Sequence, residues 1–144
     1  DNKLTLESFE RMKKTMTTDG SAGGAFSLQI ESEKASLKVI SLLATWRSKY
    51  LKLVYGDQAI FVRADIFQKM GGFSPLPICE DFDFFRGLGR KGKVVLLEEK
   101  THTSARRWKT EGIFYTTLRN ITIGGLFLLG FSPQTLSKWY SAIR

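Results

Sequence analysis

Three carboxylates fall within four consecutive positions of the chain, at Glu80, Asp81 and Asp83, in a segment rich in phenylalanine. The pattern predicts a helix over 80–90 with the carboxylates in its first turn, where unpaired backbone N–H groups and the helix dipole favour negative charge. Beside apolar rings, a carboxylate at this place can have its pKa adjusted for general-base catalysis. Ordinary capping of the helix N-terminus is the alternative use of the same residues.

A second group of candidates is the run Arg106-Arg107-Trp108. Two adjacent guanidiniums suit phosphate oxygens, and the indole offers a flat surface for a ring. Most of the net positive charge lies between residues 86 and 109, next to the acidic segment. A base that accepts a proton from a nucleophile, beside cations that hold a departing diphosphate, is the arrangement that a transferase with a phosphate leaving group needs. A solvated basic surface is the alternative.

Two further segments hold candidate binding residues. Asp57 and Gln58 follow Gly56, and both side chains can hydrogen-bond sugar hydroxyls, although an Asx-type turn is an equally good explanation. The pair Gly23 and Gly24 opens a predicted strand and permits close backbone approach, either by a ligand or by a neighbouring strand.

His102 and Cys79 are each the only residue of their type. One cysteine excludes an internal disulfide and a cysteine-cluster metal site, so we interpret Cys79 as a small buried hydrophobe and expect an intracellular, cytoplasmic protein. His102 can join carboxylates around a divalent metal ion, but no ligand spacing supports this use, and a lone histidine is also compatible with a surface position.

Composition predicts one globular domain. The 144 residues suffice for a core, and 22 Lys and Arg against 14 Asp and Glu give a net charge of +8. This charge indicates an anionic partner: phosphate, nucleic acid or a membrane surface. Asp1 opens a polar segment, unlike a signal peptide, and the apolar run 121–131 is shorter than the ~20 residues that cross a bilayer.

The periodicity of apolar residues predicts an alternation of helices and strands along the whole chain. This alternation is typical of a layered α/β sheet flanked by helices, with ligands beyond the C-terminal ends of strands. Helix 35–51 should turn one apolar side inward, and the segment 101–108 should be extended or a loop. The inward residues expected for helix 35–51 are Val39, Leu42, Leu43, Trp46 and Tyr50. The expected helices are 4–17, 35–51, 63–70, 80–90, 110–129 and 133–143, and the expected strands are 23–30, 59–62 and 93–98.

Several of these segments, taken in order, resemble the C-terminal half of family 2 glycosyltransferases of the GT-A fold. The resemblance is greatest to a bacterial subfamily that has the same ordered series, and it covers the chain from about Gly23 to the end. The ordered series is specific, whereas any one piece is not. Its pieces are Gly56-Asp57-Gln58, Gly71-Gly72-Phe73, Glu80-Asp81 and Thr103-Ser104-Ala105-Arg106-Arg107-Trp108.

The resemblance implies transfer of a sugar from a nucleotide-diphosphate donor to an acceptor hydroxyl, with Mg²⁺ or Mn²⁺ at the diphosphate. Asp81 would be the base, with Glu80 beside it. The donor sugar and the acceptor would lie near Gly56, Asp57 and Gln58. The diphosphate would lie under Arg106, Arg107 and Trp108. The acceptor cleft would be bordered by Gly23 and Gly24.

The resemblance also predicts a partial GT-A fold in a single domain, 1–144, with a core at 1–109 and C-terminal helices at 110–144. The nucleotide-binding half of such enzymes would precede this chain, and Asp1 would be the last aspartate of its metal-binding motif. As a fragment, the chain is expected to be inactive alone and to self-associate through exposed sheet edge and apolar surface.

A basic binding module for nucleic acid or for an anionic membrane is the alternative function. Aromatic residues at core spacing argue against nucleic acid, which needs exposed stacking surfaces. Helix 110–129 can instead rest on the inner face of a membrane, although packing in a core explains its apolar residues too. Its basic flanks would be Arg106, Arg107, Lys109, Arg119 and Lys138.

Overall fold

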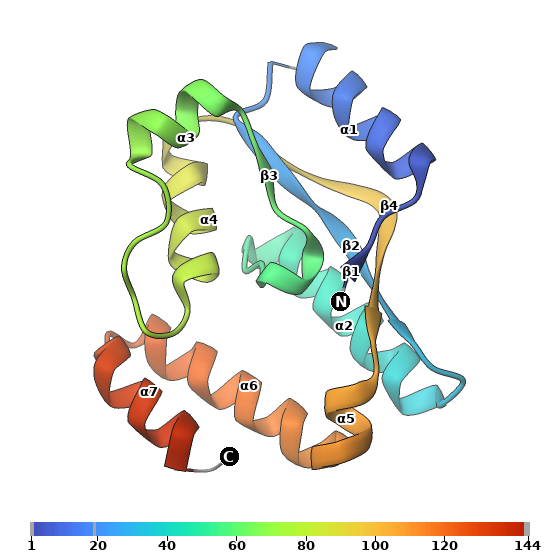
Figure 1. Cartoon of the computed structure of the whole chain (residues 1–144), viewed down its shortest axis with the longest axis vertical. Helices are drawn as coiled ribbons and strands as arrows, with labels where there is room; N and C mark the ends of the chain where they lie inside the picture. Colours follow the sequence, from blue (N-terminus) through green and yellow to red (C-terminus); the bar gives the residue numbers. More distant parts are fainter. Residues whose placement is uncertain (1, 19, 143–144) are drawn as a thin grey trace.

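A four-stranded mixed sheet forms the centre of the computed structural model, which describes residues 2–18 and 20–142 (Figure 1). The strand order is β1-β4-β2-β3. The long strands β2 (Gly23–Glu31) and β4 (Val94–Ser104) run parallel to each other. The short strands β1 (Asn2–Lys3) and β3 (Phe61–Val62) pair antiparallel with β4 and β2. The predicted α/β class is therefore confirmed.

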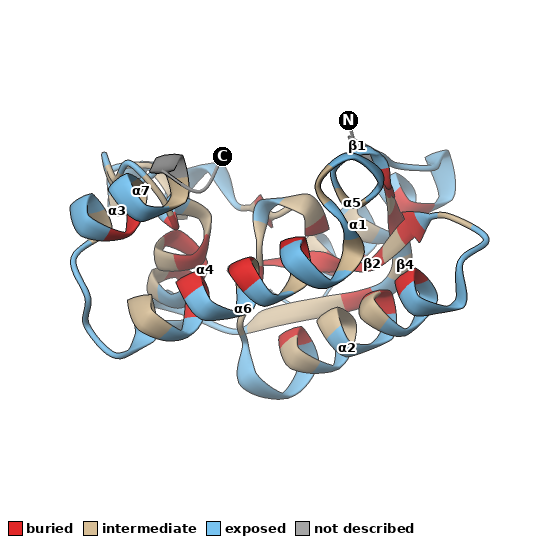
Figure 2. Ribbon diagram, turned by 90° about the horizontal axis from the view of Figure 1, so that it is seen from below, coloured by how far each residue is buried: buried red, intermediate tan, exposed pale blue. Residues whose placement is uncertain are grey.

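Helices cover both sides of the sheet, with α1 and α2 on opposite sides (Figure 2) and α5, α6 and α7 at one end (Figure 1). No helix within residues 2–18 and 20–142 is both long enough and apolar enough to cross a membrane. The helices are α1 (Leu6–Thr18), α2 (Ala35–Leu51), α3 (Ala64–Met70), α4 (Glu80–Lys91), α5 (Arg106–Glu111), α6 (Ile113–Leu128) and α7 (Pro133–Ala142), with a single 3₁₀ turn, η1 (Gly56–Gln58).

The segment after the last strand differs from the prediction. β4 continues to Ser104 because β2 pairs with it in parallel as far as Glu31, past a bulge between Phe26 and Ser27. Arg106, Arg107 and Trp108 then lie in the first turn of α5. The expected extended or loop segment 101–108 is therefore confirmed for 101–104, which belong to β4, and wrong for 106–108. The expected helix 110–129 is divided at Gly112, which has a φ of +92°.

The acidic helix α4 packs as predicted. Phe84, Phe85 and Leu88 are buried among the residues of a hydrophobic cluster that also contains Ala25 of β2. Burying an aromatic or leucine side chain stabilises a fold by about 1.5–3 kcal/mol, so this helix is held firmly against the sheet. The carboxylates in its first turn are therefore carried on a rigid element.

Helix α2 has the predicted bounds, but its inner face is not the predicted one. The five expected inward residues, Val39, Leu42, Leu43, Trp46 and Tyr50, are 52–71% exposed. The helix instead turns Ser41 and Thr45 toward the open edge of β2, where their hydroxyl oxygens accept hydrogen bonds from the backbone N–H groups of Ile30 and Leu28. Buried backbone donors must find partners, and this requirement outweighs the burial of one apolar stripe.

We expect Ser41→Ala to lower the free energy of unfolding by about 1–2 kcal/mol, because it leaves the buried N–H of Ile30 without its acceptor at 3.0 Å. Urea denaturation measures the change. Ser36→Ala is the matched control, since Ser36 is exposed on the same helix. Equal stability of the two variants would contradict the role assigned to Ser41.

Candidate active site

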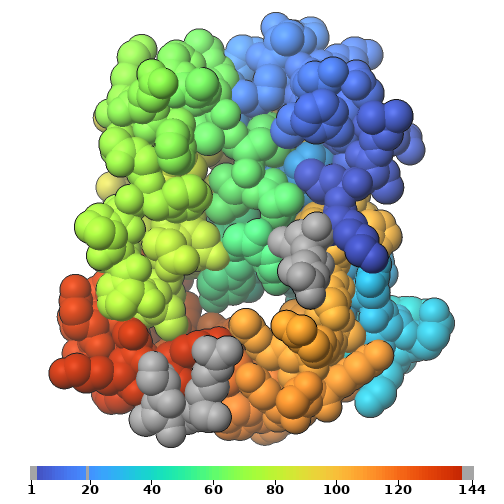
Figure 3. Space-filling model, in the orientation of Figure 1, coloured from blue at the N-terminus to red at the C-terminus, as the bar shows by residue number. Residues whose placement is uncertain are grey.

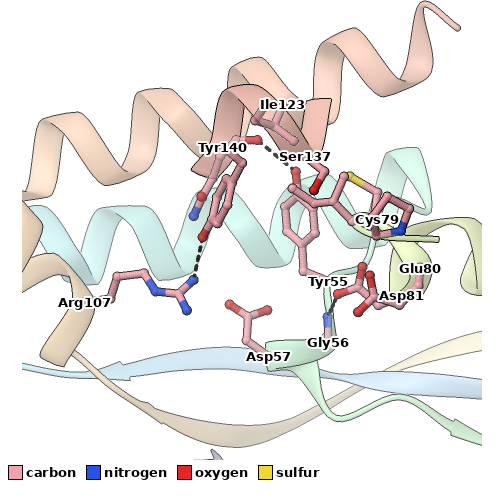
Figure 4. A pocket seen from close by; sticks show the side chains of 13 residues that line it. Tyr55, Gly56, Asp57, Cys79, Glu80, Asp81, Arg107, Ile123, Ser137 and Tyr140 are labelled. Atoms are coloured by element: carbon pink, nitrogen blue, oxygen red, sulfur yellow. Dashed lines mark hydrogen bonds between the residues drawn. The ribbon is translucent and has the colours of Figure 1, made fainter. Parts of the chain in front are cut away.

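A cavity of about 470 Å³ opens where the N-terminus of α4 and the 3₁₀ turn η1 face α5, α6 and α7 (Figure 4). Figure 3 shows the surface hollowed where the yellow-green, orange and red segments face one another. The cavity is lined by Tyr55, Gly56, Asp57, Pro77, Ile78, Cys79, Glu80, Asp81, Arg107, Asn120, Ile123, Ser137 and Tyr140.

Asp81 is held in the wall of this cavity by two backbone groups. Its Oδ1 accepts a hydrogen bond from the N–H of Phe82 at 2.7 Å, and its Oδ2 accepts one from the N–H of Gly56. A Cβ atom at position 56 would lie 3.0 Å from Oδ2, so glycine lets the carboxylate approach the turn. Gly56 and Asp81, which belong to separate pieces of the sequence series, are thus joined by direct contact.

Cys79 precedes the acidic helix in a left-handed conformation, with a φ of +62°. It is buried beside Phe82, Ile123 and Leu136, as the prediction of a small hydrophobe requires. Burial, followed by the charges of Asp81 and Glu80, raises the pKa of its thiol to about 11. The thiol therefore stays protonated and adds no charge beside the carboxylates.

Asp57 lies between Asp81 and Arg107 and points into the cavity (Figure 4). Its Oδ1 is shielded from solvent and has no hydrogen-bond partner among the described residues. Burial raises the pKa of Asp57 to about 6, although the guanidinium of Arg47 acts in the opposite direction. The charge of Asp81 raises this pKa further and that of Arg107 lowers it. Asp57 therefore titrates close to neutral pH.

Arg107 reaches the cavity from α5, and its Nη1 donates a hydrogen bond to the hydroxyl of Tyr140 on α7 at 3.3 Å. The ring of Tyr140 is in turn packed against the guanidinium of Arg119, at 4.6 Å. Arg119 also forms an ion pair with Glu111 at 2.7 Å. These contacts hold α5, α6 and α7 together behind Arg107.

Arg119 is only 5% exposed, so its predicted place among the basic flanks of a membrane-facing helix is wrong. Residues near Arg107 were also missed by the sequence analysis. Tyr140 lies within the expected helix 133–143, for which no site residue was predicted. A signal was present, since Arg119 is a lone charge in an apolar helix, and such a charge is normally paired when it is buried.

Arg106 and Trp108 line a second cavity, of about 280 Å³, which shares Asp57, Arg107 and Asn120 with the first. Arg106 is exposed. Trp108 packs partly against the cluster of Leu28, Ile30 and Leu37, and its Nε1 is buried without a hydrogen-bond partner among the described residues. The two cavities meet at Arg107, so the predicted basic run does border the same cleft as the carboxylates.

Three of the predicted binding residues do not line either cavity. Gln58 is fully buried, where its Nε2 donates to the carbonyl oxygen of Phe26 and its Oε1 accepts from Ser48. Gly23 and Gly24 lie within the sheet. A Cβ atom would lie 2.4 Å from the carbonyl oxygen of residue 61 at Gly23 and 2.1 Å from that of residue 95 at Gly24. The close approach that these glycines permit is therefore that of neighbouring strands.

Of the two proposed metal ligands, the structure describes only His102. His102 lies on β4 and lines a different cavity, together with Gln29 and Glu31, and Asp1 lies outside the described residues. In the part of the chain that the structure describes, no three His, Cys, Asp or Glu side chains are grouped so that they can hold a metal ion. The described residues thus do not supply a fitting metal site.

The cleft can therefore accept a proton on one side and hold an anion on the other. Asp81 and Asp57 supply carboxylate oxygens, and Arg107 and Arg106 supply guanidinium groups. Hydroxyl groups of Tyr55 and Ser137 complete a polar wall. No protein-family model matches the chain, and no curated protein or solved structure matches it either.

Proposed function

We propose that this chain carries the acceptor side of a glycosyltransferase that uses a nucleotide-diphosphate sugar. The observation that carries the proposal is the common cavity of Asp81 and Arg107, residues 26 positions apart in a sequence order that resembles family 2 glycosyltransferases. A carboxylate facing a guanidinium across one cleft is the pair of groups that the reaction requires. The partial GT-A fold is part of the same proposal.

In the proposed reaction, the acceptor hydroxyl donates its proton to the carboxylate of Asp81. The hydroxyl oxygen then forms a bond to the anomeric carbon of the donor, while the bond from that carbon to the diphosphate breaks. The nucleoside diphosphate leaves with the bonding electrons. Arg107 and Arg106 offset the negative charge that develops on it, because guanidinium groups bind phosphate oxygens in two-point contacts.

Asp57 supports this step by its position between the base and the cations. Its carboxylate points into the cavity, where it can accept a hydrogen bond from a sugar hydroxyl. Above its pKa of about 6 it is ionised, and the acceptor would then meet two carboxylates. We propose that Asp57 orients the sugar and that Asp81 takes the proton.

The direct test is release of nucleoside diphosphate from a panel of UDP-, GDP- and dTDP-sugars, with hydroxyl acceptors and Mg²⁺ or Mn²⁺. The 144-residue chain and the product of the complete reading frame that contains it are both assayed. We expect turnover of one donor class by the product of the complete reading frame, and loss of that turnover in its Arg107→Gln variant. Absence of turnover with every donor, together with salt-dependent binding to oligonucleotides, would replace the proposal by the basic binding module.

A further inference from the structure

The outer sides of α2 and α6 each carry a stripe of large apolar side chains. On α2 the stripe is formed by the residues that were expected to face inward. On α6 the spacing of the exposed residues likewise places them on one side of the helix. Isolated exposed apolar residues are common, but two complete helical stripes are not. The stripe residues are Val39, Leu42, Leu43, Trp46 and Tyr50 on α2, and Phe114, Leu118, Ile121 and Leu129 on α6 and its C-terminal end.

The two stripes belong to one side of the molecule. Ile113, at the start of α6, packs in the same cluster as Ile40 and Ala44 of α2, so the helices are neighbours. Figure 2 shows them side by side, with buried residues toward the top of the view and exposed residues toward the bottom. We call this surface the α2–α6 face; it comprises the nine stripe residues named above.

A cationic cavity adjoins the C-terminal end of α2. It has a volume of about 520 Å³, and its wall includes Leu51, at the end of α2, together with Lys52, Arg86, Arg90 and Lys93. None of these four cations forms an ion pair with another residue of the described chain. The other end of α2 is mixed in charge, with Glu31 and Glu33 near Lys34 and Lys38. One end of the apolar surface thus adjoins a cavity wall with four cations and no acidic residue.

We propose that the α2–α6 face binds the surface of an anionic lipid bilayer, with the cavity of Lys52, Arg86, Arg90 and Lys93 receiving lipid phosphate groups. A bilayer supplies both parts of the complementary surface, acyl chains for the stripes and anionic headgroups for the cations. Trp46 and Tyr50, whose rings pack together at 5.5 Å, carry polar groups on large rings, a combination that favours the membrane interface.

A second copy of this chain fits the surface less well. It would offer apolar residues to the stripes, but Glu31 and Glu33, at the other end of α2, lie beside Lys34 and Lys38, so that end offers the cations no net negative charge. Nucleic acid would satisfy the cations and leave the stripes in water. Of these three partners, the lipid surface is the one whose chemistry matches both features, and this inference does not depend on the proposed sugar transfer.

The test is cosedimentation of the chain with vesicles of phosphatidylcholine containing about one third phosphatidylserine, compared with pure phosphatidylcholine. We expect binding to the anionic vesicles to be about tenfold tighter, or more, and to weaken as salt rises. The double variant Leu43→Glu/Trp46→Glu should lose at least about tenfold in affinity, because its charges enter the interface. Lys52→Gln/Arg90→Gln should abolish the preference for anionic lipid.

Leu6→Glu is the matched control, since Leu6 is 77% exposed on α1, on the opposite side of the sheet. It should bind vesicles as the parent chain does. Unchanged binding in Leu43→Glu/Trp46→Glu would overturn the proposal. So would a dimer in solution that this variant dissociates while neither protein binds vesicles, because the partner would then be a second copy. Circular dichroism verifies that the variants are folded.

Discussion

Asp81→Asn is expected to lower the rate of sugar transfer by about 10²- to 10⁴-fold, the usual contribution of a general base. The amide occupies the same volume and cannot accept the proton of the acceptor hydroxyl. Donor binding should change little, because the donor diphosphate is assigned to Arg106 and Arg107 on the other side of the cleft. The measurements are turnover of the donor identified by the panel assay and, separately, donor affinity by calorimetry.

Asp83→Asn is the control for this prediction. Asp83 lies two positions further along the same helix, accepts a hydrogen bond from the hydroxyl of Ser74 at 2.9 Å, and lines a different cavity. Its variant should transfer sugar at close to the parent rate. The free energy of unfolding is measured for both variants, because Asp81 also accepts two backbone hydrogen bonds. Retained turnover in a folded Asp81→Asn protein would remove Asp81 from the role of base.

Asp57→Asn is expected to raise the free energy of unfolding by about 2 to 3 kcal/mol above pH 6.5 and to leave it nearly unchanged below pH 3.5. Burial raises the pKa of Asp57 from its ordinary value of 3.8 to about 6 in the folded chain. The folded state therefore binds the proton more tightly than the unfolded state. Stability is lost as the pH rises from the lower pKa to the higher one, and the asparagine variant, which does not ionise, avoids this loss.

Urea denaturation of Asp57→Asn and of the parent chain across pH 3.5 to 8 measures the difference. The two stability curves should separate between pH 4 and pH 6 and stay parallel above it. Curves that remain parallel across the whole range would show that Asp57 titrates normally. We expect Asp57→Asn to be more stable than the parent chain and to transfer sugar more slowly. Together, these two results would show that the carboxylate of Asp57 lowers stability and serves the function.

Local patterns in the sequence determined the elements that need few distant partners. The bounds of α2 and the inward face of α4 follow from the repeat of apolar residues. The end of α3 follows from Gly71, which adopts a φ of +77° and caps the carbonyl groups of the last turn. The carboxylates in the first turn of α4 were placed for the same reason, because a helix start is recognised from the residues beside it.

Other features depended on contacts between distant parts of the chain. The inward face of α2 was set by Ile30 and Leu28, whose backbone N–H groups needed acceptors at the open edge of β2. The extension of β4 to Ser104 needed β2 as its partner, and it moved the basic run into a helix. The spacing of apolar residues within α2 or within β4 does not show which segment of the chain each will pair with.

Some properties of the candidate site follow from local sequence, and others depend on contacts between distant parts of the chain. The sequence by itself determined that Asp81 opens a helix and that Arg107 belongs to a basic run. Only the tertiary structure decided that both line one cavity, that Asp57 lies between them with a raised pKa, and that Gln58 faces the core instead. The physical reason is that burial and pairing of a polar group depend on which distant segments surround it, whereas a helix start depends on its immediate neighbours.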